Sequence, residues 1–169
     1  VAGFRSAAEA LLDDGLAGIR VTLIGAGGAA AAVCAALEAA GGRVQVVSRS
    51  EDRSRALEAR FPATVAAMSS LDAALVDATL VVNATPLGLH AQDPLPVPIP
   101  SIPRGAAVLD LVYRRVGTTP WIATAQAEGR RAADGRQMLL EQGAVAFERW
   151  FGFAPDRQAM SAALGRAAR

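Results

Sequence analysis

Apolar and polar positions along this chain form blocks with two different spacings. Short apolar runs, typical of strands buried on both faces of a sheet, alternate with longer segments in which apolar residues recur at helical spacing. The predicted strands are 21–24, 44–47, 64–67, 79–82 and 106–111. The predicted helices are 4–14, one that follows the glycine turn and runs to about residue 40, 51–61, 69–76, 119–128, 134–151 and one from about 156. We therefore expect an α/β fold with a doubly wound, mostly parallel sheet.

One segment, residues 83–105, carries neither spacing and is rich in proline. Because proline has no N–H and breaks regular structure, we expect a loop there. Its position after a predicted strand suggests that it lies over the carboxyl ends of the strands.

Composition excludes several functions. The net charge of +1 and the scattered arginines give no surface for nucleic acid. No apolar run reaches the roughly 18 residues of a membrane span, no signal peptide is indicated, and the single Cys34 has no internal disulfide partner. We expect a cytoplasmic protein without a metal site. The pattern indicates no particular oligomeric state.

All 17 cationic residues are arginine, and the chain contains no lysine. A mechanism that needs a lysine therefore cannot run on this chain alone. The first residue is Val1 rather than methionine, which suggests a piece of a longer protein.

The stretch "VTLIGAGGAAAAVCAAL" places a glycine turn between a strand and a helix. Its residues Gly25, Ala26, Gly27, Gly28 and Ala29, followed by Ala30, fit the G-x-G-x-x-[G/A] template of dinucleotide-binding βαβ units. Free N–H groups at the start of such a helix receive a pyrophosphate. The alternative is that these glycines only permit a tight turn.

The end of the second predicted strand indicates which dinucleotide binds. An NAD site usually carries Asp or Glu there, whereas this chain has Ser48, Arg49 and Ser50. Arg49 and Arg53 are four residues apart and can bracket a 2′-phosphate, which predicts NADP. The alternative is a solvated helix start in which Glu51 and Asp52 face the helix dipole.

A length of 169 residues suits a single domain. We divide it into an entry helix (1–18), a Rossmann-like core (19–133) and C-terminal helices (134–169).

Further candidates follow later strands. Asn83 and Thr85 leave the fourth strand where a nicotinamide ribose would pass, although the same residues also make a simple turn. Tyr113 ends the stretch "LDLVY", at the strand edge where such sheets bind ligands. His90 has no identifiable carboxylate partner, so we interpret it as a solvated loop residue.

Two residues of a late helix face the same way. Met138 and Gln142 are one turn apart in "DGRQMLLEQGAVAFERW". The alternatives are core packing for Met138 and a surface position for Gln142.

Taken in order, these stretches resemble the carboxyl-terminal domain of shikimate dehydrogenases. The matching stretches are "GAGGA", "SRS..R", "NATPLGL", "LDLVY", Thr119-Pro120 and "DG..ML...Q". The resemblance covers nearly the whole chain. It implies an NADP-binding domain of an enzyme that reduces 3-dehydroshikimate to shikimate in the pathway to chorismate and the aromatic amino acids.

The resemblance also implies roles for residues. Residues 25–29 would hold the pyrophosphate, and Arg49, Ser50 and Arg53 would surround the 2′-phosphate. Nicotinamide and its ribose would lie near Asn83, Thr85, Leu111, Gln137 and Met138. Tyr113 and Gln142 would reach the hydroxyls of a small-molecule substrate, shikimate or a relative.

In the family, an amino-terminal domain binds the substrate and supplies a catalytic Lys and Asp. The resemblance thus implies that this domain is missing here and that the chain alone is inactive. No residue of the chain itself is expected to be catalytic.

The chain departs from the family pattern at four places. Ser48 replaces Asn, Leu111 stands where Met is common, Gln137 replaces a glycine, and Arg114-Arg115 replaces a frequent Asn-Pro. A side chain at residue 137 would crowd the nicotinamide, which leaves open a different substrate such as quinate. A further alternative is a non-catalytic module that senses the nucleotide.

Overall fold

The computed structural model describes residues 1–167, which build one six-stranded parallel sheet in the order β3-β2-β1-β4-β5-β6. The strands are β1 (Arg20–Ile24), β2 (Arg43–Ser48), β3 (Ala63–Ala67), β4 (Leu80–Asn83), β5 (Ala107–Asp110) and β6 (Ala132–Ala133). The strand order reverses between β1 and β4, as in doubly wound sheets. The predicted fold class is therefore confirmed.

The central strands are short and apolar because both of their faces are covered. All four residues of β4 and of β5 are buried. Register places Ile24 beside Asn83, and Asn83 beside Asp110. The carboxyl ends of three neighbouring strands thus meet at one edge of the sheet.

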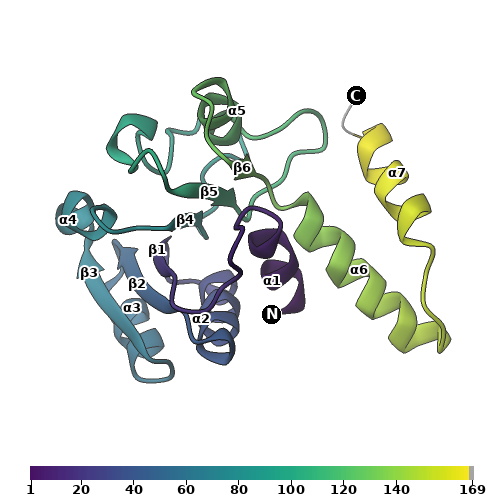
Figure 1. Ribbon diagram of the computed structural model, residues 1–169, viewed down its shortest axis with the longest axis horizontal. Coiled ribbons are helices and arrows are strands. Elements are labelled where there is room, and N and C mark those ends of the chain that lie inside the picture. Colours follow the sequence, from purple (N-terminus) through teal and green to yellow (C-terminus); the bar gives the residue numbers. More distant parts are fainter. Residues whose placement is uncertain (168–169) are drawn as a thin grey trace.

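Helices cover the two faces of the sheet (Figure 1). The helices α1 (Ala2–Glu9), α2 (Gly28–Ala40) and α3 (Glu51–Glu58) contribute to one buried apolar cluster. The helices α4 (Leu71–Leu75) and α5 (Pro120–Ala127) contribute to the other. The helices α6 (Arg136–Phe151) and α7 (Arg157–Ala167) extend beyond the sheet, on the right of Figure 1, and α1 packs along α6.

The second half of the proline-rich segment is part of the core. Val97, Ile99 and Ile102 are fully buried, and a 3₁₀ turn spans Ile99–Ser101. The indole Nε1 of Trp121 donates to the Val97 carbonyl at 2.8 Å. The expectation that the whole segment lies over the strand ends was wrong for this half. The prolines prevent a helix, but the apolar residues between them still bury against α5.

Other boundaries also differ from the prediction. Helix α1 ends at Glu9 rather than near residue 14, and a 3₁₀ turn (Met68–Ser70) precedes the short α4. Strand β6 was not predicted, because two residues carry no periodicity. Within residues 1–167, no helix has the length and apolar character that crossing a membrane requires.

Candidate nucleotide-binding site

The glycine loop leaves β1 at a point where backbone segments nearly touch. Gly25 has φ +105°, and a Cβ there would lie 2.9 Å from Thr85 Cγ2 and 3.0 Å from the Ala84 carbonyl oxygen. Only glycine fits this position without strain. Gly25 therefore lets the loops after β1 and β4 lie against each other.

The next two glycines have a different surrounding. A Cβ on Gly27 or Gly28 would meet no described atom within 4 Å. Gly27 is the N-cap of α2, and no side chain among residues 1–167 caps this helix. The first-turn N–H groups of α2 thus remain for water or for an anionic ligand.

A cavity of about 210 Å³ opens beside this loop. It joins the glycine loop, the end of β2 and the turn after β4. Its lining residues are Gly25, Ala26, Gly27, Ser48, Arg49, Ser50, Arg53, Met68, Ala84, Thr85 and Pro86. Most of the residues predicted for pyrophosphate and 2′-phosphate therefore share one cavity. Gly28 lies at an adjacent depression with Arg53, and Ala29 is exposed on the first turn of α2.

Two arginines near the start of α3 line this cavity, Arg49 from the turn between β2 and α3 and Arg53 from the first turn of α3. Ser48 Oγ accepts a hydrogen bond from the Ser50 N–H at 3.1 Å and so shapes the turn. Both Arg49 and Arg53 line the cavity, and no Asp or Glu is among the described residues that do so. Two guanidinium groups and two serine hydroxyls form a donor set that suits a phosphate.

The acidic residues at the start of α3 do not neutralise these arginines. Glu51 makes its ion pair with Arg55, one turn further along the helix. No described ion pair joins Arg49 or Arg53 to an acidic residue, while the exposed Glu51–Arg55 pair is also compatible with a solvated helix start.

Asn83 and Thr85 have distinct places. Asn83 is fully buried, and its Oδ1 accepts from the Thr85 N–H at 3.0 Å and from the Thr85 hydroxyl at 2.6 Å. Its Nδ2 donates to the Leu87 carbonyl at 2.9 Å and to Asp110 Oδ1 at 2.8 Å. The amide of Asn83 is thus occupied in shaping the turn, while Thr85 lines the cavity.

Asp110, at the end of β5, is a functional candidate that the sequence analysis missed. It is fully buried and accepts hydrogen bonds from the Thr119 hydroxyl at 2.7 Å and the Val112 N–H at 3.0 Å. Burial raises the pKa of the Asp110 carboxyl to about 6, although its three hydrogen-bond donors act to lower it. The signal was present in the sequence, because an acidic residue ends the apolar run "AAVLD".

Of the residues expected near nicotinamide and substrate, Thr85 lines this cavity and the others do not. Tyr113 follows β5 and is 43% exposed, and Leu111 is half-buried. A Cβ on Gly135 would lie 2.4 Å from the Leu111 carbonyl oxygen, so the start of α6 packs directly on this turn. The structure therefore brings α6 to the carboxyl end of β5.

Along α6, the three predicted residues all meet α1. The Gln137 amide reaches Ser6 Oγ at 3.4 Å, and Met138 packs against Gly3. Gln142 is exposed and lines a groove between the two helices. Gln137 thus points along α1 and does not line the 210 Å³ cavity.

His90 is an exposed loop residue. The backbone N–H of His90 donates to Asp93 Oδ2 at 2.9 Å, and the backbone N–H of Gly88 donates to the same oxygen at 3.0 Å. These two bonds lower the pKa of the Asp93 carboxyl. The backbone of His90 therefore shapes the loop, and its exposure agrees with the solvated interpretation.

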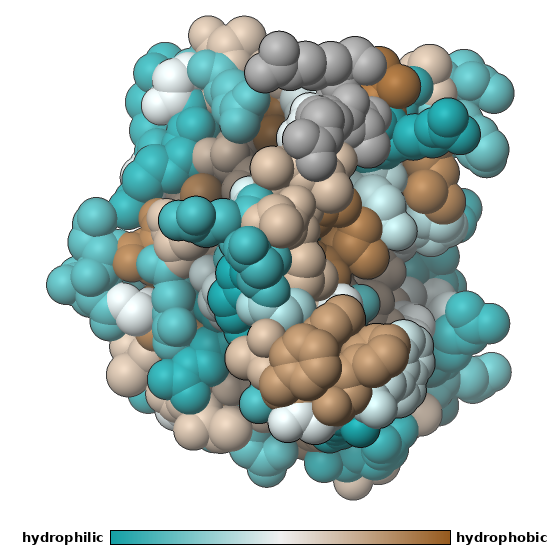
Figure 2. Space-filling view, turned by 90° about the vertical axis from the view of Figure 1, so that its right-hand side faces the viewer, coloured by the Kyte–Doolittle hydropathy of each residue, from teal (hydrophilic) through white to brown (hydrophobic). Residues whose placement is uncertain are grey.

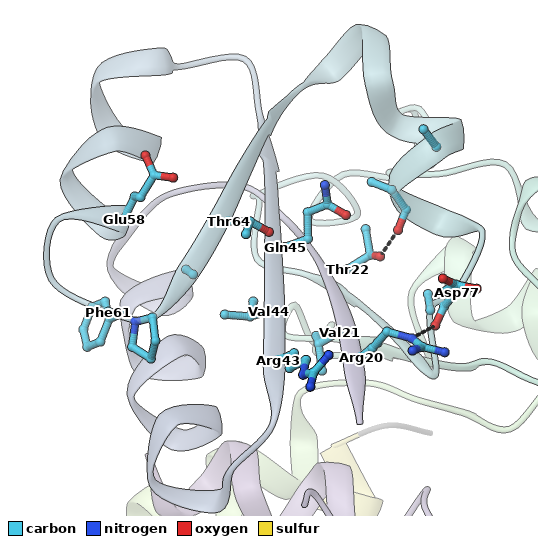
Figure 3. A pocket seen from close by; sticks show the side chains of 15 residues that line it. Arg20, Val21, Thr22, Arg43, Val44, Gln45, Glu58, Phe61, Thr64 and Asp77 are labelled. Atoms are coloured by element: carbon cyan, nitrogen blue, oxygen red, sulfur yellow. Dashed lines mark hydrogen bonds between the residues drawn. The ribbon is translucent and has the colours of Figure 1, made fainter. Parts of the chain in front are cut away.

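A larger cavity, of about 510 Å³, lies at the opposite end of the strands (Figure 3). Thr22, Gln45 and Thr64 lie side by side across three strands on its wall, and the Thr22 hydroxyl donates to the Ala74 carbonyl. Arg20 and Arg43 stand at its lower end in this view. Ligands of doubly wound sheets bind at the carboxyl ends, so this cavity is separate from the candidate site.

Comparison with known proteins gives consistent matches. Residues 6–90 match the family model described as shikimate / quinate 5-dehydrogenase, and residues 135–164 match the shikimate 5′-dehydrogenase C-terminal domain. The shikimate dehydrogenase (NADP(+)) of Nitrobacter winogradskyi is 43% identical over 136 residues, which are 79% of this chain and 48% of that protein.

Solved structures agree in fold. The shikimate 5-dehydrogenase of Thermus thermophilus, in complex with NADP(H) and shikimate, has a TM-score of 0.80 at 37% identity over 98% of this chain and 61% of its own. The quinate dehydrogenase of Corynebacterium glutamicum, in complex with NAD, has a TM-score of 0.81 at 28% identity over 94% and 58%.

The chain spans about half the length of the curated relative from Nitrobacter winogradskyi. The matched family model covers half of the chain, including the glycine loop, both cavity arginines and the turn after β4. The chain belongs to the shikimate / quinate 5-dehydrogenase family.

Proposed function

We propose that this chain binds NADP(H) in the 210 Å³ cavity and is the cofactor-binding part of an enzyme that interconverts 3-dehydroshikimate and shikimate. The observation that carries the proposal is the pair Arg49 and Arg53 beside the glycine loop, in a cavity whose described lining holds no carboxylate. A 2′-phosphate would find two cationic donors there, whereas a ribose 2′-OH would find no acceptor of the usual kind.

Each part of the cavity takes one part of the dinucleotide. The pyrophosphate lies against the first-turn N–H groups of α2, and the 2′-phosphate lies between Arg49, Ser50 and Arg53. Met68 adds an apolar wall at the adenosine end. When bound, the nicotinamide supplies the hydride chemistry of the reaction.

The substrate side of the site lies along the turn after β5 and along α6. Tyr113 and Gln142 reach the substrate, while Leu111 and Met138 adjoin the nicotinamide. Asn83 acts through Thr85 rather than by direct contact, because its amide is already bonded within the turn.

A second domain, preceding Val1 in the whole enzyme, supplies the acid and base. Support comes from the absence of lysine in this chain and from its coverage of about half of a relative. Figure 2 views the side with α6 and α7 and shows an apolar patch. Apolar surface for such a domain comes from Trp150 and Phe151 at the end of α6 and from Phe153 in the segment before α7, which are 58–79% exposed.

Titration of the chain with NADPH and with NADH tests the cofactor proposal. We expect NADPH to bind more tightly, and Arg49→Ala to weaken NADPH about tenfold while NADH is unchanged, because a charge-assisted bond to phosphate is lost. Arg55→Ala is the matched control, since Arg55 pairs with Glu51 and lies outside the 210 Å³ cavity. Equal affinity for the two nucleotides would refute the NADP assignment.

An activity assay tests whether this chain only binds the nucleotide while the second domain supplies the acid and base. The 169-residue chain is expected to bind the nucleotide but to oxidise neither shikimate nor quinate, whereas the full-length enzyme oxidises shikimate faster than quinate. Turnover by the chain alone would show that its own residues suffice for proton transfer. Faster oxidation of quinate than of shikimate by the full-length enzyme would mean that quinate, and not shikimate, is the substrate.

A further inference from the structure

A buried carboxylate links the two loops that carry the proposed nicotinamide and substrate contacts. Asp110 accepts hydrogen bonds from Asn83 at the end of β4, from Val112 after β5 and from Thr119, the N-cap of α5. These three donors come from three separate segments of the chain. One carboxylate thus fixes their relative positions.

The link continues from Asp110 to the wall of the cavity. The Asn83 Nδ2 that donates to Asp110 belongs to the amide whose Oδ1 accepts from both the N–H and the hydroxyl of Thr85. Thr85 in turn lies directly against Gly25, and both residues line the cavity. Two hydrogen bonds therefore separate Asp110 from a residue that lines the site.

The link also reaches the substrate side. Val112, whose N–H is held by Asp110, is followed by Tyr113, and its carbonyl accepts from the Gly135 N–H at 3.1 Å. Thr118, beside the Thr119 donor, donates to Asp134 Oδ2 at 3.0 Å. The start of α6 is thus tied to the same turn.

We propose that Asp110 is a positioning residue of the site, which sets the turn after β4 against the turn after β5 and so orients the nicotinamide half of the cofactor. The inference rests on the proposed function. It assigns no contact between Asp110 and the cofactor, because the carboxylate is fully buried and its oxygens are bonded within the protein.

This role predicts an effect on one half of the dinucleotide only. Arg49, in the turn after β2, and Arg53, in the first turn of α3, stand at the 2′-phosphate end, and no described hydrogen bond joins Asp110 to either segment. A fragment that lacks nicotinamide, adenosine 2′,5′-bisphosphate, should therefore bind independently of Asp110. NADPH should not.

The experiment compares NADPH and adenosine 2′,5′-bisphosphate in calorimetric titrations of the wild type, Asp110→Ala and Asp110→Asn. We expect Asp110→Ala to weaken NADPH about tenfold, because buried donors lose their acceptor, and to change the fragment less than about twofold. Asp110→Asn keeps an acceptor for Asn83 and Val112, so it should restore NADPH affinity to within about threefold. Asp77→Ala, a carboxylate at the opposite end of β4, is the control.

The outcomes separate the two proposals. If the wild type binds neither ligand, the proposed function fails. If Asp110→Ala weakens both ligands equally, or weakens neither, the positioning role is overturned while the NADP site stands. Should Asp110→Ala not fold, the two single variants Asp110→Asn and Thr119→Val decide. Thr119→Val removes the hydroxyl that donates to Asp110, so it must weaken the binding of NADPH and leave the binding of adenosine 2′,5′-bisphosphate unchanged.

Discussion

Gly3 of α1 crosses Met138 of α6 so closely that a Cβ on the glycine would lie 2.8 Å from the Met138 carbonyl oxygen and 2.9 Å from its Cγ. The two helices lie at opposite ends of the chain, and this crossing joins them. Phe4, Ala7 and Ala8 of α1 then bury against the sheet. A residue without a side chain is required where the backbones meet.

Gly3→Ala is expected to lower the free energy of unfolding by about 1–3 kcal/mol, because the added methyl group meets backbone that cannot rotate away. Urea unfolding followed by circular dichroism measures this. Gly165→Ala is the matched control: it also lies in a helix, has no described atom within 4 Å of its Cβ position, and should be neutral or slightly stabilising. Equal effects of the two changes would contradict the close crossing.

Substitution of two glycines in the same loop should affect different properties, stability for Gly25 and NADPH affinity for Gly27. Gly25→Ala combines a positive φ with a blocked Cβ and is expected to cost about 2 kcal/mol of stability. Gly27→Ala adds a methyl group to open space, so stability should change by no more than about 1 kcal/mol while NADPH affinity falls. Thermal melts and NADPH titration of both variants separate the effects. Unchanged NADPH binding in Gly27→Ala would count against a pyrophosphate at this loop.

Cys34 should resist thiol reagents in the folded protein. It is fully buried in α2, and desolvation raises the pKa of its thiol to about 11. Since the thiolate is the reactive form, modification at neutral pH should become rapid only after denaturant is added. Mass spectrometry of samples treated with and without urea checks this. Rapid labelling of the native chain would mean that α2 opens easily.

The two tryptophans provide a matched pair. Trp121→Phe removes the donor to the Val97 carbonyl and leaves it buried, which is expected to cost about 1–3 kcal/mol. Trp150→Phe changes a side chain that is 79% exposed and should stay within about 0.5 kcal/mol of the wild type. Urea unfolding measures both. A small effect at Trp121 would mean that the segment around Val97 is only loosely attached.

Stability should depend on pH through Asp110. The folded-state pKa is raised from 3.8 to about 6, so the folded chain binds this proton more tightly than the unfolded chain does. The contribution of the carboxyl is therefore most favourable below about pH 4 and falls by about 3 kcal/mol as pH rises through 6. Asp134 also faces the group and raises its pKa, and Arg136 pairs with Asp134.

Asp110→Asn removes this titration. Relative to the wild type, the variant should gain stability as pH rises from about 4 to about 7. Urea unfolding of both proteins across this range gives the difference. A difference that does not vary with pH would show that Asp110 is ionised in the folded chain throughout the range.

Local pattern was sufficient for most of the sheet. The runs that became β1, β4 and β5 are apolar because both faces are covered, and this signal is visible without any contact information. Arg49 and Arg53 could also be identified as candidates from the sequence, because their four-residue spacing is a local pattern. Strand β6 was not, because it is defined only by its pairing with β5.

What the sequence analysis missed depends on contacts between distant residues. Asp110 acquires its role because register places it beside Asn83, 27 residues earlier. Val97 and Ile99 become core residues only when α5 supplies Trp121. Proline content correctly argued against a helix in this segment, but it carries no information on burial.

The position of β1 between β2 and β4 has a consequence for synthesis on the ribosome. Val21 finds its partner Val44 early, but its other partner, Leu80, appears much later in the chain. Until then, one side of β1 offers unpaired backbone groups to any passing strand. Such non-local pairing makes folding slow and leaves the nascent chain dependent on prompt arrival of β4. A pause before β4 has left the ribosome would prolong that exposed state, and a pause after β4 has emerged would not.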